Sequence, residues 1–426
     1  MALIEVLLLH VVQVSLAIGV LTFTSPNSIS RPAFFPIILG LTVYILPNIH
    51  DSVQTDAQAS FFTTSVVGIF LQYLDFGLIS RWSFLARGPT SDRGRQPVLK
   101  PNAVACKTGE DYGHETSCWT RLKWGVDAIM LWRAPGTIWE AKGTPHFDSH
   151  DSARVPSRSR FLRKTIAKLL LSWLVFDLLS LLPPMTAQQR EEAFMWQKVP
   201  FFSRVSDASS AQEILIRVQS TFLFWLATYF ILDMFYCAVS LLGVMLGFGA
   251  VDRWRPLFGS VTQSSSIRRF WGQFWHQAMR PKLTSPAFYM TYTVLGYKRR
   301  GSMGRYVFIM LTFAVSGLFH TAQEYTAGVP LEQSGSMRFF CMQGIGILIE
   351  DAAQGVRLSL GVAPRKSGGQ WLGYVWVVLW MIWTTPAWAY PKLRNVTGTP
   401  RDRMSPFSIL GPVLSGGRGM YDYIIA

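Results

Sequence analysis

Two histidines in apolar surroundings are the side chains best suited to chemistry. His320 lies near the end of the stretch YVFIMLTFAVSGLFHTAQEY, where Thr312 and Ser316 precede it at intervals of four residues. This spacing predicts one polar stripe on an apolar helix, and Gly317 would let another group approach it closely. An ionisable residue inside such a segment is costly and is therefore a functional candidate. Histidine titrates near neutrality, which favours proton transfer at His320, with a packed histidine as the alternative.

The second histidine, His276, ends the aromatic run RFWGQFWH. A helix over Arg268–Arg280 would have an aromatic face and a polar face. The aromatic face would carry Phe270, Trp271, Phe274 and Trp275, and the polar face Arg269, Gln273, His276 and Arg280. We expect the aromatic face to meet lipid and the polar face to border a cavity. The alternative is an interfacial helix without chemistry.

Apolar blocks of membrane-spanning length carry or flank these residues. Charged residues make up 15% of the 426 residues, against about 25% in soluble proteins. Roughly 20 apolar residues cross a bilayer. The candidate spans are Met1–Phe23, Ala33–Pro47, Phe61–Ser80, Thr165–Leu182, Ile214–Gly249, Gly304–Thr321, Arg338–Gln354, Trp371–Tyr390 and, more weakly, Phe407–Ile425. This predicts an all-α polytopic membrane protein with eight or nine transmembrane helices and in-plane helices enclosing an intramembrane chamber. Ile214–Gly249 could be one span or two.

Three parts follow one another along the chain. Residues 1–80 are predicted to be N-terminal transmembrane helices, 81–164 a cytosolic loop, and 165–426 a transmembrane core. Within the loop, Arg121–Arg133 carries Leu122, Val126 and Ile129 at helical spacing. Tryptophan and arginine flank them, which predicts a helix lying in the membrane plane.

The net charge of +15 is spread between the apolar blocks, which argues against a nucleic-acid partner. If Ile214–Gly249 is one span, the loops near 25–32, 81–164, 250–305 and 357–369 hold 29 of the 40 Lys and Arg. The opposite loops, near 50–60, 184–213, 323–337 and 391–404, hold seven. The positive-inside rule places the first set in the cytosol and the N-terminus in the lumen. We expect a multi-pass protein of the endoplasmic reticulum membrane.

The motifs WRPLFGS and RFWGQFWHQ, followed by SGLFH on an apolar helix, resemble the membrane-bound O-acyltransferases. They are most similar to the wax-synthase-like branch and its fungal members, which acylate terpenoid secondary metabolites. The resemblance is specific over about 250–325. It implies that His320 is the intramembrane general base and His276 a second catalytic polar position. RLKWGVDAIMLWRAPGTIWE also resembles the branch, but Arg133-Ala134-Pro135-Gly136 stands where Arg-Gly-aliphatic-Gly-Trp is usual.

The activity implied by the resemblance is acyl transfer, with acetyl expected, from acyl-CoA to a lipophilic alcohol among the membrane lipids. A positioned base contributes about 10²–10⁴-fold. Because the thioester supplies the leaving group, we expect no metal or bound cofactor. Basic residues of the 250–305 loop are candidate contacts for the CoA phosphates, although they also satisfy the positive-inside rule. These are Arg268, Arg269, Lys298, Arg299 and Arg300. Further candidate substrate contacts are Trp271, Gln273, Trp275 and Ser316.

Other functions stay open at the level of sequence. A wax synthase would join long acyl chains to fatty alcohols. A transporter or channel could use a polar path of Asp75, Asp177, Asp233 and His320, although repeated halves are absent. A polar loop contains residue types that bind metals, but no metal site is predicted there. They are His146, Asp148, His150 and Asp151. The acceptor and the oligomeric state are not specified.

Overall fold

The computed structural model describes residues 3–94, 117–180, 185–200, 211–361 and 370–396. Within them the long helices fall on the predicted apolar blocks, so the all-α fold is confirmed. Their bounds are α1 Leu3–Phe23, α2 Ser30–Ser52, α3 Asp56–Tyr73, α6 Arg158–Ser180, α8 Ala211–Met245, α11 Ser302–Thr326, α12 Ser336–Ser359, α13 Gln370–Thr384 and α14 Pro386–Arg394. The predicted block Phe407–Ile425 lies outside the described residues.

Five helices of the described ranges are long and apolar enough to cross a membrane: α1, α2, α3 with its π-helical extension η1 (Leu74–Ile79), α8 and α11. The pair α13 and α14, bent by 43°, would make a sixth. This count is lower than eight or nine because α6 and α12 carry too much charge. The charged residues are Arg158, Arg160, Arg163, Lys164, Lys168 and Asp177 in α6, and Arg338, Glu350, Asp351 and Arg357 in α12.

The block with two possible readings, Ile214–Gly249, forms one continuous helix. α8 has 35 residues, which at 1.5 Å per residue is about 50 Å. A hydrocarbon core is about 30 Å thick, so α8 is long enough for one tilted span with extended ends. Asp233 in its middle forms an ion pair of 3.0 Å with Lys168 of α6, which packs along α8.

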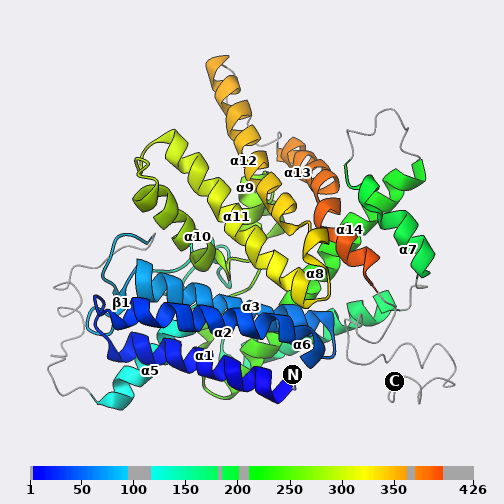
Figure 1. Ribbon diagram of the computed structural model, residues 1–426. Helices are drawn as coiled ribbons and strands as arrows, with labels where there is room; N and C mark the ends of the chain where they lie inside the picture. The colour runs from blue at the N-terminus through cyan, green and yellow to red at the C-terminus, as the bar shows by residue number, and fades with distance from the viewer. Residues whose placement is uncertain (1–2, 95–116, 181–184, 201–210, 362–369, 397–426) are drawn as a thin grey trace, which may run out of the picture.

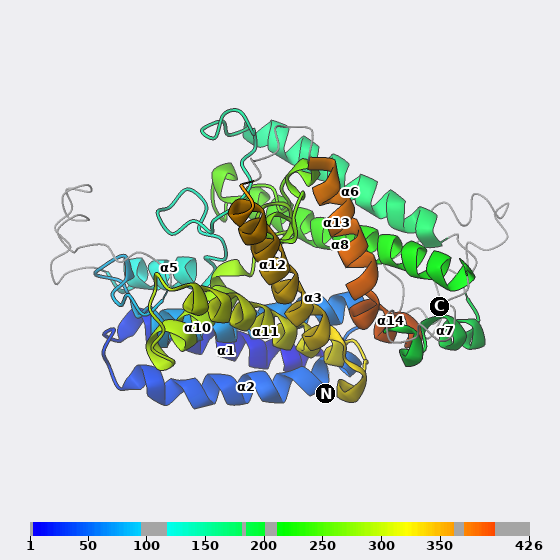
Figure 2. The same cartoon turned by 90° about the horizontal axis from the view of Figure 1, so that it is seen from above.

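The helices form two groups. α1, α2 and α3 lie side by side, and α11 crosses α3 and packs on α12 (Figure 1). Seen from above, α8 and α6 run together on the other side (Figure 2). Shorter elements connect them: β1 Trp82–Ser83 and β2 Gly88–Pro89, which pair antiparallel, α5 Cys118–Ile129, α7 Ala187–Phe194, η2 Trp196–Lys198, η4 Val251–Arg253, η5 Val261–Gln263, α9 Ile267–Arg269, η6 Phe270–Phe274, α10 Arg280–Tyr289, η7 Met290–Val294 and η8 Leu331–Gln333.

Loops that charge assigns to the same side of the membrane contact one another. Arg299 of the 250–305 loop pairs with Asp92 of the 81–164 loop at 3.2 Å. On the other predicted side, Arg394 donates to Gln333 Oε1 at 2.7 Å. The packing therefore agrees with the predicted grouping of these loops. Which group faces the cytosol stays a prediction.

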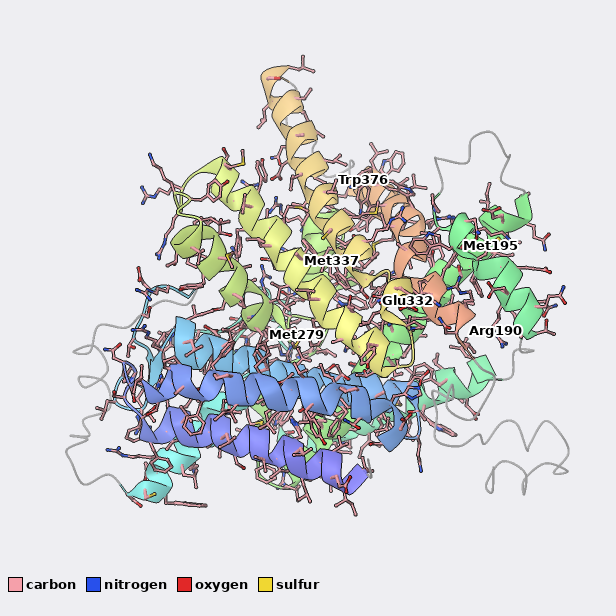
Figure 3. The ribbon with its side chains drawn as sticks, in the orientation of Figure 1. Arg190, Met195, Met279, Glu332, Met337 and Trp376 are labelled. Carbon is pink, nitrogen blue, oxygen red and sulfur yellow. The ribbon has the colours of Figure 1, made fainter. Side chains whose placement is uncertain are left out.

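The close approach expected at Gly317 is found where α11 crosses α12. A Cβ at Gly317 would lie 2.9 Å from the Cα of Met337, and Met337 marks this crossing in Figure 3. The helix expected within Arg121–Arg133 is also present as α5, which packs against α1. Ile129 is buried, whereas Val126 stays exposed.

The continuous helix predicted over Arg268–Arg280 is wrong. The α-helical turn α9 passes into the π-helix η6, and at Trp275 the backbone becomes extended, with φ −68° and ψ 151°. The aromatic side chains pack in the protein core rather than in lipid. Phe270 and Trp275 are both buried and stack with centroids 5.8 Å apart. Burial of this aromatic cluster outweighs regular helix geometry and leaves His276 on a non-helical segment.

Candidate active site

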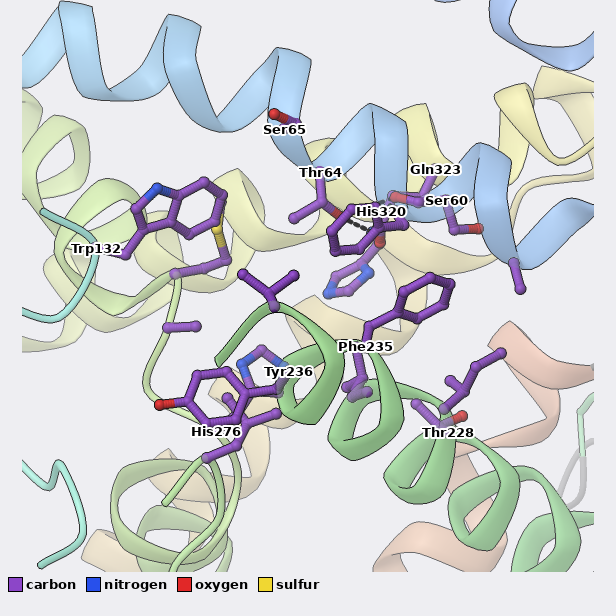
Figure 4. A pocket seen from close by; sticks show the side chains of 18 of the residues that line it. Ser60, Thr64, Ser65, Trp132, Thr228, Phe235, Tyr236, His276, His320 and Gln323 are labelled. Atoms are coloured by element: carbon purple, nitrogen blue, oxygen red, sulfur yellow. Dashed lines mark hydrogen bonds between the residues drawn. The ribbon is translucent and has the colours of Figure 1, made fainter. Parts of the chain in front are cut away.

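Both predicted histidines line one large cavity of about 2460 Å³. Its walls come from α3, α8 and α11 and from the segments around residues 119–137 and 246–257. The walls are mostly apolar, with a few polar groups between aromatic and aliphatic side chains. Figure 4 shows His320 and His276 projecting into this space from different elements.

The ring of His320 is held by aromatic contacts. It stacks on Phe340 of α12 with centroids 4.4 Å apart and an interplanar angle of 2°. The edge of Trp388 of α14 lies against it at 5.0 Å. Its Nδ1 is buried and has no hydrogen-bond partner among the described residues. The ring is thus fixed in orientation, and one nitrogen is left free for a substrate.

A polar tie beside His320 fastens α11 to α3. Gln323, three residues after the histidine, donates from Nε2 to Thr64 Oγ1 at 2.7 Å and to the Ser60 carbonyl at 3.3 Å (Figure 4). Nearer the helix end, the hydroxyls of Thr63 and Thr326 are 2.6 Å apart. Sequence reasoning did not single out Gln323. Its spacing of three residues from His320 on the same helix was the available signal.

His276 enters the cavity from the segment that follows Trp275. Phe258 lies 6.0 Å from its ring, edge to face, and its Nδ1 has no hydrogen-bond partner in the described ranges. Burial, reinforced by the positive charge of Arg133, lowers the pKa of His276 to about 4. The imidazole is therefore neutral at physiological pH.

Arg133 is a cavity residue to which the sequence assigned no role. Its side chain is buried and donates to the carbonyls of Pro256 and Arg255, both at 2.6 Å, and to the Tyr236 hydroxyl at 2.6 Å. Tyr236 of α8 in turn donates to the Arg255 carbonyl at 2.5 Å. Arg133 thereby joins the α5 segment, α8 and the loop before His276. The next residue, Ala134, has a φ of 50°, a conformation that usually selects glycine.

Of the residues predicted to contact substrate, only Trp275 lines the cavity with the two histidines. The others lie elsewhere. Arg268 pairs with Asp351 at 2.7 Å, and Arg269 donates to Gln273 Oε1 at 3.3 Å. Trp271 donates to Gln343 Oε1 at 3.3 Å, and Ser316 is buried outside the cavity lining. The candidate phosphate contacts Lys298, Arg299 and Arg300 are exposed and do not line the cavity either.

Basic side chains from loops on both predicted sides of the membrane do line the cavity. Lys123 of α5 and Arg253 of η4 belong to the two loops that the charge pattern places in the cytosol. From the loops on the predicted opposite side come Arg190 and Lys392, together with the acidic Asp56. Sequence reasoning missed Lys123 and Arg253 because their neighbourhood depends on the packing of α5 against the chain after α8.

The polar path of the transporter alternative is not assembled. None of Asp75, Asp177 and Asp233 lines the cavity with His320. Asp75 accepts hydrogen bonds from Ser80 and, at 2.6 Å, from Ser285. In the polar loop, His146 Nδ1 lies 2.7 Å from Arg255 Nη1, and Asp148 pairs with Arg154 at 2.9 Å.

Comparisons with known proteins agree with the motifs. The model of the "Membrane bound O-acyl transferase family" matches residues 254–342, an interval containing both histidines. "Acetyltransferase aurG" of Calcarisporium arbuscula is 40% identical over 92% of this chain and 93% of its own length. "Acetyltransferase fsoF" of Humicola fuscoatra is 31% identical over 89% and 94%. "Acetyltransferase ataH" of Aspergillus terreus is 33% identical over 66% and 92%. No solved structure matches the chain.

Proposed function

The chain belongs to the membrane bound O-acyl transferase family, and on that premise we propose that it transfers an acetyl group from acetyl-CoA to a hydroxyl of a hydrophobic acceptor, with His320 as general base. The observation that carries the proposal is the free Nδ1 of a rigidly packed histidine facing an apolar cavity. The relatives named above as acetyltransferases support acetyl as the transferred group.

The proposed reaction needs one proton acceptor near the attacking oxygen. The acceptor hydroxyl attacks the thioester carbonyl carbon while its proton passes to the neutral imidazole of His320. The carbon–sulfur bond then breaks, and the CoA thiolate leaves and receives that proton. The products are the ester and free CoA. An alcohol is a weak nucleophile until a base takes its proton, so the position of His320 governs the rate.

His276 is proposed to orient the substrates on the same cavity. Since its imidazole is neutral at physiological pH, one ring nitrogen carries a hydrogen and can donate a hydrogen bond to the thioester oxygen. Such a donor stabilises the charge that develops on that oxygen in the transition state. Arg133 supports this role because it fixes the backbone of residues 255–256, near the segment that carries His276.

The two substrates are proposed to enter by different routes. Lys123 and Arg253 would attract the CoA phosphates on the side assigned to the cytosol. The apolar cavity walls would accept a lipophilic body, and we propose a terpenoid alcohol of the endoplasmic reticulum membrane.

The proposal is tested with membranes containing the full chain, labelled acetyl-CoA or palmitoyl-CoA, and a panel of terpenoid and fatty alcohols. We expect an acetylated terpenoid alcohol. Palmitoyl esters of fatty alcohols would show a wax synthase instead. A chain that makes no ester with either donor would contradict the proposal.

The base assignment needs its own variants. His320→Ala should lower kcat at least about a hundredfold with little change in substrate affinity. His320→Gln keeps hydrogen-bonding capacity but cannot take the proton, so it should be nearly as inactive. The exposed His150→Gln serves as the matched control. Full activity of His320→Gln at normal expression would show that the ring is only packed.

A further inference from the structure

Trp132 lines the reaction cavity (Figure 4), and its indole contacts residues of two helices. On one side is Gly68 of α3, where an added Cβ would lie 2.8 Å from Cη2 of the indole. Lys282 of α10 lies over the ring, with its Nζ 4.2 Å from the ring centroid. The side chain therefore has little room to move sideways.

Lys282 is an unusual neighbour for a cavity wall. Only 1% of the residue is exposed, and its ammonium has no hydrogen-bond partner among the described residues. Over the face of an indole the ring quadrupole attracts a cation, and this attraction is strongest when water is excluded. The contact with Trp132 and the charge of nearby Asp75 thus both compensate for burying this amine, and Lys282 holds the indole in return.

The chain on both sides of Trp132 is also anchored, by backbone carbonyls before it and by a side chain after it. Gln72 of α3 donates from Nε2 to the carbonyls of Ala128, at 3.1 Å, and Leu131, at 3.3 Å. The following Arg133 makes the three hydrogen bonds described above. Because the residues before and after Trp132 are fixed, the Cα of Trp132 stays in place and the indole cannot move with it.

Trp132 stands next to the reacting centre. Met279 and Phe319 pack in the same cluster and line the cavity beside it. Phe319 directly precedes His320, and Met279 follows His276 by three residues. A group bound between the two histidines would therefore share its cavity with this cluster.

The cavity is too large to select a short acyl group by volume. Ligand sites usually measure about 300–1,000 Å³, whereas this cavity measures about 2460 Å³. Preference for a two-carbon acyl group, which rests on the proposed function, requires an acyl stop, that is, a side chain near the base that blocks longer acyl chains. We propose that Trp132 is that stop and determines acyl-chain length, with Gly68 and Lys282 as positioning residues that hold its indole in place.

Competition binding tests this without a known acceptor. The full chain in nanodiscs binds labelled acetyl-CoA, which is displaced by unlabelled acetyl-, butyryl- or hexanoyl-CoA. In the wild type, hexanoyl-CoA should compete at least about tenfold more weakly than acetyl-CoA. Trp132→Ala should abolish that difference, because it removes the part of the cavity wall that the indole forms. Lys282→Met should reduce it, since the indole loses its cation.

Glycine substitutions provide a variant that narrows the cavity at Trp132 and a matched control. Gly68→Ala should push the indole into the cavity and weaken acetyl-CoA binding as well. Gly40→Ala should bind like the wild type, since a Cβ there meets nothing within 4 Å. An unchanged hexanoyl-to-acetyl ratio in folded Trp132→Ala would overturn the proposal, as would a change confined to acceptor selectivity in turnover assays. A wild type that binds no acetyl-CoA would instead refute the donor assignment, and the acyl stop with it.

Discussion

At the scale of single residues, His276 and Arg133 form an electrostatic unit beside the proposed base. Burial and the charge of Arg133 keep the pKa of His276 at about 4, so His276 is neutral above about pH 5. We expect its contribution to activity to be constant from pH 6 to 8 and to fall only when the medium approaches pH 4. His276→Ala should raise KM as well as lower kcat, because an orienting group acts on bound substrate.

Comparison of the wild type with His276→Asn over pH 4–8 measures this. Asparagine keeps a hydrogen-bond donor but does not titrate. His276→Asn should retain more activity than His276→Ala, and its activity should not fall as the pH approaches 4. A wild-type transition centred near the usual histidine value, and missing in His276→Asn, would contradict a neutral His276.

Lys282 makes a second prediction, on stability. Burial lowers its pKa to about 7, although the charge of Asp75 opposes the shift. In the unfolded chain the amine titrates near 10.4. Between these values the unfolded state binds more protons than the folded state, so wild-type stability should rise with pH from about 7 to 10. Lys282→Met has no amine at this position, so it lacks this pH-dependent contribution to stability.

The melting temperature of both proteins in detergent, taken at several pH values, checks this. Lys282→Met should exceed the wild type most at pH 7 and below, and the difference should shrink as the pH rises. The exposed Lys123→Met should show no such trend. A constant difference between Lys282→Met and wild type would mean that Lys282 titrates normally.

At the scale of elements, the crossing of α11 and α12 depends on Gly317. A methyl group there would press on the backbone at Met337, which cannot move aside as a side chain tip can. Overpacking of this kind costs about 1–3 kcal/mol. Gly317→Ala should therefore lower the melting temperature and shift His320, reducing kcat too. Gly355→Ala in α12, where a Cβ meets nothing within 4 Å, is the matched control and should be at least as stable as the wild type.

The elements also show what sequence reasoning can reach. Long apolar blocks, the α5 helix and the close approach at Gly317 followed from periodicity and residue size. His320 and His276 followed from motif resemblance, and the structure brings them to one cavity. The end of the helix at Phe274 was missed. The spacing of the aromatic residues fits a helix that faces lipid, but the same residues can also pack in a protein core without continuing the helix. Lys123, Arg133 and Lys282 were missed because their neighbours lie far away in the chain.

At the scale of the whole molecule, the pairing of loops makes a topology prediction. Cysteine labelling in sealed microsomes should place residues 81–164 and 250–300 in the cytosol. It should place 50–60 and 323–337 in the lumen. The structure ties the members of each pair together, through Arg299 with Asp92 and through the tie of Gln323 to Ser60. Labelling of 250–300 and 323–337 from the same side would therefore contradict both the charge pattern and the packing.

The same topology decides where the donor enters. Arg268 and Arg269 were the first candidates for the CoA phosphates, but Arg268 is committed to Asp351, which also pairs with Arg305. Lys123 and Arg253 line the cavity, and Arg253 is only loosely paired with Asp127 at 3.5 Å.

Because a phosphate contact acts on the donor alone, Lys123→Glu and Arg253→Glu should raise KM for acetyl-CoA and leave acceptor KM nearly unchanged. Each contact is a charge-assisted hydrogen bond of about 1.5–3 kcal/mol, or roughly ten- to hundredfold in donor KM. Arg268→Glu, in protein that still folds, should leave donor KM near the wild-type value. A raised donor KM in Arg268→Glu, with normal values in the other two variants, would contradict this assignment. It would show that the donor binds at the surface near α12 and not beside α5.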